Sequence, residues 1–203
     1  DPHRDTPVEI LHVVLLGFVK YYWRDAISRL SDEQNRVLTH RLSSADVSGL
    51  GFSPLKGETL VQFAGSLTGS NFRAIAQVAP FVLYDLVPKP CFEAWLALSA
   101  LIPLVWQPVI TDIEEYLVRY IHSAAIDRFL SCAVEWTPRW FNKPKFHIIK
   151  HLPMHIHRFG PAMLYATEGF ESFNAVICDH SVHSNHQAPS RDIARRFAHC
   201  NRN

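Results

Sequence analysis

Apolar residues recur at helical spacing along most of the sequence, and strand-like alternation is almost absent. Residues 8–27 show this spacing on a wide apolar face, and residues 92–105 are nearly all apolar. Residues 59–63 are a weak strand candidate. The clearest helical pattern runs to about Trp136 through Ile113, Leu117, Tyr120, Ile121, Ala124, Phe129 and Ala133. The pattern therefore predicts a mainly α fold in a single helical domain that spans residues 1–203.

Local signals indicate where several of these helices begin and end. Pro7 suits the first turn of the first helix, because an N–H at that position would have no partner inside the helix. Residues 31–34 and 111–114 have the spacing of capping boxes. Residues 43–57 are rich in Ser, Gly and Pro and predict a loop. Pro80 is expected to kink or break the apolar helix around it.

Charge is distributed unevenly along the chain, although its net value is only +1. Residues 7–136 form the expected helical part, and residues 137–203 form a basic part with eight of the twelve histidines. From Arg139 onward the chain carries a net charge of +5, and the rest carries −4. An anionic partner would therefore bind the C-terminal part. No apolar run reaches the ~20 residues of a membrane span, so we expect no membrane partner.

Histidines are concentrated between Lys145 and Pro161. His147, His151 and His155 lie four positions apart, so one continuous helix would place them on one face. Such a face can hold Zn²⁺, although Ile148 follows His147 and the HExxH pattern of metalloproteases is therefore missing. Hydrogen-bonded helix residues and phosphate contacts are the alternative roles. A second cluster comprises His180, His183 and His186.

Three acidic residues are candidates for a divalent metal site. Glu168 and Glu171 lie three positions apart and would share a helix face. Glu9 lies near the other end of the chain, and acids far apart in sequence can meet to bind a metal for phosphoryl transfer. Ordinary surface carboxylates would show the same spacing.

Four stretches in order resemble segments of CACTA-type (En/Spm-like) transposases and their fungal relatives. The stretches are EILHVVLLGFVKYYW (9–23), GSNFRAIAQVAPFVLYDLVP (69–88), KFHIIKHLPMHIHRFGP (145–161) and ATEGFESFNAVI (166–177). Their order and intervals agree with the family over nearly the whole chain. The resemblance implies the C-terminal part of an RNase H-like catalytic region, with its helical insertion and without its opening strands.

The resemblance also implies a set of catalytic residues. In that family three acids bind two Mg²⁺ ions, and the second and third acids correspond to Glu9 and Glu171, with Glu168 as a one-turn alternative. His147 and His151 correspond to histidines of the family pattern and join the two acids as metal candidates. The first acid would lie upstream of residue 1. We therefore expect a catalytically incomplete remnant of a DDE-type transposase or nuclease.

The expected function is DNA binding by a transposase-derived domain, in the nucleus by resemblance and otherwise in the cytoplasm. Within 145–161, the expected core residues are Ile148, Ile149, Leu152 and Phe159. The expected phosphate contacts are Lys145, Lys150, Arg158, Arg191, Arg195 and Arg196. The alternatives are a histidine-rich metal-binding module or metal-dependent enzyme that uses Zn²⁺, and a helical protein-interaction domain. Self-association and a separate N-terminal transposase segment are further expected partners.

Overall fold

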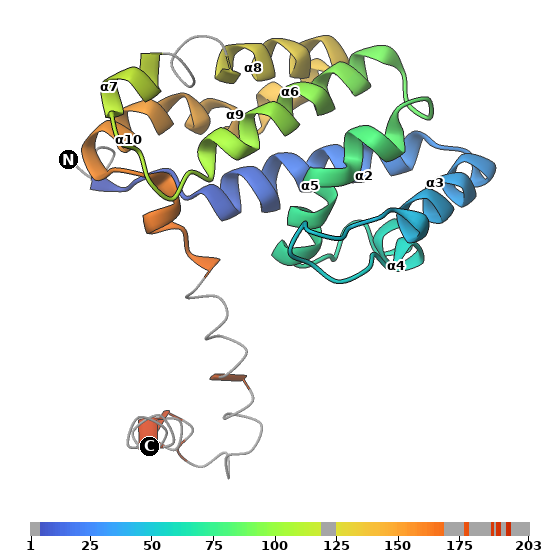
Figure 1. Cartoon of the computed structure of the whole chain (residues 1–203), viewed down its shortest axis with the longest axis horizontal. Helices are drawn as coiled ribbons and strands as arrows, with labels where there is room; N and C mark the ends of the chain where they lie inside the picture. Colours follow the sequence, from blue (N-terminus) through green and yellow to red (C-terminus); the bar gives the residue numbers. More distant parts are fainter. Residues whose placement is uncertain are drawn as a thin grey trace. The chain divides into compact units, whose positions relative to one another are not determined.

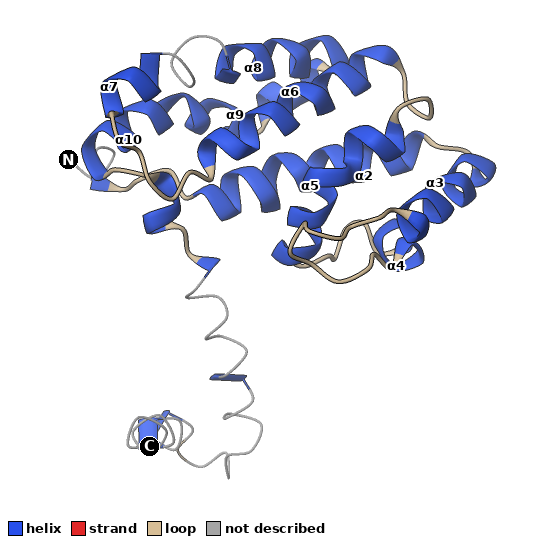
Figure 2. Ribbon diagram, viewed as in Figure 1, coloured by secondary structure: helices blue, strands red, loops and turns tan. Residues whose placement is uncertain are grey.

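The computed structural model describes residues 5–118, 125–168, 177–178, 188, 190–191 and 194–195. The chain divides into two compact units, Asp1–Ala166 and Thr167–Asn203. The described residues are helical or in loops and contain no strand, which confirms a mainly α structure (Figure 2). The first unit extends past the change in composition at Arg139 and holds all the elements described below.

Helices account for most of the first unit (Figure 1). The label η1 denotes a π-helix, and η3 to η5 are short 3₁₀-helices. The elements are η1 (Leu11–Val19), α2 (Lys20–Arg29), α3 (Asp32–Ser44), α4 (Gly57–Gln62), α5 (Gly69–Leu83), α6 (Lys89–Val105), α7 (Ile113–Tyr116), α8 (Ala125–Trp136), η3 (Pro138–Asn142), α9 (Pro144–Ile148), η4 (Ile149–His151), α10 (Leu152–Phe159) and η5 (Ala162–Tyr165). No helix in the described ranges is long and apolar enough to cross a bilayer.

Side-chain caps explain the start of several helices. The capping box of Ser31 and Gln34 is present at α3, as predicted. At α7 the capping residue is Asp112 rather than Thr111, because the Asp112 carboxylate accepts the N–H of Glu115. Because Asp112 follows Thr111, the helix begins one residue later than predicted.

Two sequence predictions were wrong in their local detail. Residues 59–63 are not a strand, since Gly57–Gln62 forms α4. A Cβ on Gly57 would lie 2.2 Å from the carbonyl oxygen of Thr39, so glycine allows α4 to pack closely on α3. Pro7 precedes the first helix instead of occupying its first turn.

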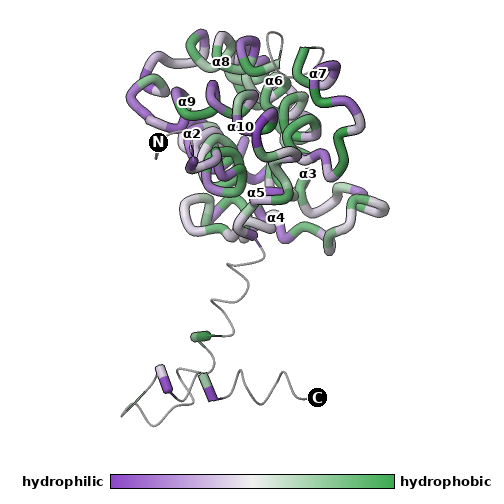
Figure 3. Tube along the Cα trace, turned by 90° about the vertical axis from the view of Figure 1, so that its left-hand side faces the viewer, coloured by the Kyte–Doolittle hydropathy of each residue, from purple (hydrophilic) through white to green (hydrophobic). Residues whose placement is uncertain are grey.

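The core is built around aromatic residues of the first helical run, η1 and α2. Phe18, Tyr22 and Trp23 are completely buried. Their rings contact aromatic rings from α6, α8, η3 and α9, namely Trp95, Phe129, Trp136, Trp140 and Phe146. Residues 137–166 therefore pack with the N-terminal helices as part of one core. Both hydrophobic and hydrophilic residues occur along the helical part of this unit (Figure 3), and the hydrophobic ones supply the core.

The packing of the helices places α2 next to the chain that follows α8. α6 packs against α8 and α5, and α5 also packs against η1. α9 packs against both η1 and η3. As a result, the first helical run and residues 138–148 lie side by side, and they share the surface that carries the candidate site.

Candidate nucleic-acid interface

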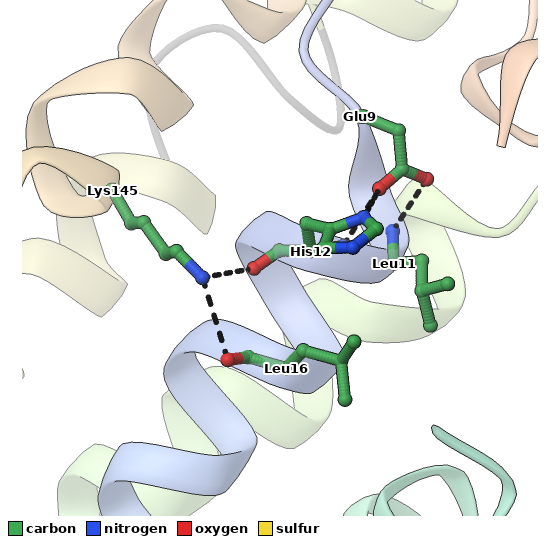
Figure 4. A network of polar contacts seen from close by, with 5 residues as sticks. All are labelled: Glu9, Leu11, His12, Leu16 and Lys145. Carbon is green, nitrogen blue, oxygen red and sulfur yellow. Dashed lines mark hydrogen bonds and ion pairs between the residues drawn. The ribbon is translucent and has the colours of Figure 1, made fainter. Parts of the chain in front are cut away.

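Glu9 caps the start of the first helix (Figure 4). One carboxylate oxygen, Oε1, accepts the N–H of Leu11 at 3.0 Å. The other, Oε2, accepts the N–H of His12 at 2.7 Å and lies 2.6 Å from His12 Nδ1. Because each carboxylate oxygen offers two lone pairs, these contacts fill Oε2 and leave at most one lone pair on Oε1. The negative charge is also favourable at a helix N-terminus.

The family resemblance implies that Glu9 is a Mg²⁺ ligand, and its contacts in the cap affect that role. Within the described ranges no three His, Cys, Asp or Glu residues come together as a metal-binding group. Glu171 lies outside the described residues, and Glu9 is committed to its cap. The described residues alone therefore provide no complete two-Mg²⁺ centre, and no Mg²⁺-dependent step follows from them.

Lys145 is turned towards the first helix, although the sequence predicts a phosphate contact there. Its Nζ donates to the carbonyl oxygen of His12 at 2.6 Å and to that of Leu16 at 3.4 Å (Figure 4). Burial, and secondarily the nearby Lys20 ammonium, lower the pKa of Lys145, with Glu9 opposing them. This lysine therefore joins α9 to η1 as an internal contact.

Beside Lys145, a groove of about 530 Å³ runs between α2 and η3. Its charged lining groups are Arg24, Arg139, Lys143 and Asp25, and Tyr21 and Trp140 form its aromatic wall. The two rings are parallel within 10°, with centroids 6.3 Å apart. The groove therefore combines three cations and one carboxylate with an aromatic wall.

The single carboxylate of this groove is already neutralised. Asp25 Oδ2 lies 2.5 Å from Arg29 Nε, and Asp25 Oδ1 lies 3.1 Å from Arg139 Nη2. The Arg139 side chain is nevertheless 72% exposed, whereas that of Asp25 is 12% exposed. The Lys143 ammonium lies 5.6 Å from the centroid of Tyr21, within the range of a cation–π contact. The solvent side of the groove is therefore positively charged.

The other predicted phosphate contacts belong to both units of the chain. Lys150 is exposed on η4. Arg158 is exposed as well, but its Nη2 lies 2.5 Å from Asp5 Oδ1 and its guanidinium packs on the Phe159 ring. Arg191 and Arg195 are exposed in the second unit, and Arg196 lies outside the described residues. Neither Lys150 nor Arg158 lines the groove.

The expected core face of residues 145–161 is half correct. Ile149 and Leu152 are completely buried, as predicted. Ile148 and Phe159 are each 36% exposed, so their assignment to the core was wrong. The helical run is divided into α9, η4 and α10, with Pro153 in the first turn of α10, and this break changes which residues face inwards.

The histidines of this segment have three different environments. The Nε2 atoms of His147 and His151 lie 3.3 Å apart on the surface. His155 is 3% exposed, and its Nδ1 accepts the N–H of Val8 at 2.9 Å. His157 lies on the surface, 3.0 Å from Glu114 Oε1. The predicted pair is therefore brought together, while His155 belongs to the core.

Sequence reasoning missed most of the groove. Arg139 and Lys143 were counted only as part of the basic C-terminal part, and Tyr21 and Arg24 only as part of a buried helix. A usable signal was the alternation of cations and aromatic residues in KYYWR (20–24) and RWFNK (139–143). That two such segments meet depends on the tertiary packing of the first helical run against η3.

No protein-family model matches the chain, and neither a curated protein nor a solved structure matches it.

Proposed function

We propose that this chain is a DNA-binding domain of transposase descent. The groove between α2 and η3 binds the phosphate backbone of DNA. The observation that carries the proposal is the exposed set of Arg24, Arg139 and Lys143 around a single carboxylate that already has two cationic partners.

The chemistry of the groove supports phosphate binding over base recognition. Lysine and arginine bind phosphates electrostatically and release counterions, which requires no particular base sequence. Arg139 is largely exposed while it contacts Asp25, so a phosphate can approach its remaining donors. Tyr21 holds the Lys143 ammonium near its ring, which reduces the freedom that this side chain loses on binding. The four stretches that resemble CACTA-type transposases add support from the sequence.

The proposal is tested by removing two cations of the groove. Arg139→Gln combined with Lys143→Gln is expected to weaken binding of a fluorescently labelled DNA duplex, measured by anisotropy. For each phosphate contact, the logarithm of the binding constant falls by about 0.9 for every tenfold increase in salt concentration. One contact therefore contributes about tenfold in affinity at 0.1 M salt, relative to 1 M salt. The double variant is therefore expected to lose about 10- to 100-fold.

Lys56→Gln combined with Lys89→Gln is the matched control, because both lysines are exposed and neither lines the groove. It removes the same charge and is expected to change affinity much less. Urea midpoints of both double variants establish that each is folded. Equal losses of affinity in the two variants would show that only net charge matters and would overturn the assignment of the groove.

A further inference from the structure

His147 and His151 have a geometry suited to a metal chelate. They lie four positions apart, at the junction of α9 and η4, and both are exposed. Their rings are inclined by 75°, with centroids 5.1 Å apart. The two Nε2 atoms face one another at 3.3 Å. Two imidazole nitrogens that can each bind a metal therefore already lie close together on the surface.

The separation of the two nitrogens matches the edge of a tetrahedral zinc site. Zinc binds histidine nitrogen at about 2.0–2.1 Å, and two ligands at the tetrahedral angle then lie about 3.3–3.4 Å apart. Without metal, one ring can donate its Nε2–H to the other. When zinc binds, each ring carries its single proton on Nδ1, and the two Nε2 atoms bind the metal in place of that hydrogen bond. The neutral pair therefore releases no net proton.

The remaining histidines of the segment are committed elsewhere. His155 accepts a backbone N–H in the core, and His157 contacts Glu114. No group of three potential ligands forms among the residues that the structure describes. His147 also lines a groove of about 440 Å³ beside α8, together with Asp127 and Lys150, which leaves room for water ligands.

We infer that His147 and His151 bind one divalent transition-metal ion, such as Zn²⁺, through their Nε2 atoms, with water in the remaining coordination positions. This site is separate from the DNA-binding groove, whose lining includes neither histidine. Metal binding by His147 and His151 therefore does not depend on whether the groove binds DNA.

Zinc titration of the full chain by calorimetry tests this site. His147→Ala and His151→Ala are each expected to remove one bound Zn²⁺ from the wild-type stoichiometry, and the double variant is expected to lose no more than either single variant. Both side chains are exposed, and melting curves recorded without zinc check that folding is unchanged. Zinc should also raise the melting temperature of the wild type more than that of either variant.

Two controls separate a chelate from general binding to histidines. His40→Ala removes an exposed histidine of α3 and is expected to leave the stoichiometry unchanged. Ile148→His combined with His151→Ala keeps the number of histidines but places the second ring about 100° around the helix from His147 instead of about 40°. This variant is expected to remain one ion short. Recovery of the ion, additive losses in the single variants, or no loss in them would overturn the inference.

Discussion

Lys143 and Lys145 show how neighbouring residues of one type can have different roles. Both ammonium groups lie 5.6 Å from the centroid of Tyr21. Lys145 donates to two backbone carbonyls and is partly buried, whereas Lys143 is exposed in the groove. Lys145 therefore contributes to stability, and Lys143 is available to a ligand.

Substitution of each lysine by methionine is expected to separate these roles. Lys145→Met removes two hydrogen bonds from a charged donor and is expected to lower the free energy of unfolding by about 1.5–3 kcal/mol. Lys143→Met is expected to leave stability within about 0.5 kcal/mol of the wild type and to weaken DNA binding. Urea unfolding and anisotropy measure the two effects. Equal destabilisation by the two substitutions would contradict the distinction.

The pKa of Lys145 adds a pH signature to this comparison. Burial lowers this pKa from its ordinary value of 10.5. At pH values between the pKa of the folded state and 10.5, the unfolded chain therefore binds more protons than the folded chain. The stability of the wild type relative to Lys145→Met should therefore rise as pH increases through this window towards 10.5. A relative stability that falls over the same window would contradict the assigned burial.

At the scale of elements, the contact between η1 and α9 depends on Gly17. A Cβ at this position would lie 2.8 Å from Lys145 Cδ and 3.0 Å from the carbonyl oxygen of His12. Glycine therefore provides the space in which the lysine stem reaches the helix backbone. The same contact holds α9 beside the first helical run and so helps to position η3 and the groove.

Gly17→Ala is expected to displace the Lys145 side chain and to lower the free energy of unfolding by about 1–2 kcal/mol. In a Lys145→Ala background the same change should cost at least about 1 kcal/mol less, because residues in contact give non-additive effects. Urea unfolding of the four chains of this double-mutant cycle provides the measurement. Additive costs would show that Gly17 and Lys145 act independently.

At the scale of the whole molecule, the sequence was sufficient for the class of structure and for local signals. Periodicity predicted the helices, the capping box at Ser31 was correct, and the four-residue spacing of His147 and His151 identified a pair that does meet. The cap formed by Glu9 and the inward orientation of Lys145 could not be predicted, because both depend on how backbone groups are presented after folding. The groove combines segments separated by more than a hundred residues, and no local pattern specifies such a meeting.

The uneven charge along the chain is related to the groove. The first two cations of the basic C-terminal part, Arg139 and Lys143, meet Arg24 of the N-terminal run in one groove. A field from clustered cations attracts phosphate without specifying a base sequence. We therefore expect DNA binding that depends strongly on salt and little on the base sequence.

The most direct test of DNA binding is a salt series of anisotropy titrations with the purified chain and two labelled duplexes of unrelated sequence. We expect log Kd to rise linearly with log salt for both duplexes, and we expect Arg139→Gln combined with Lys143→Gln to lower the slope by about 0.9 for each lost contact. Absence of binding at low salt, or a slope that the double variant leaves unchanged, would show that this groove does not bind the DNA backbone.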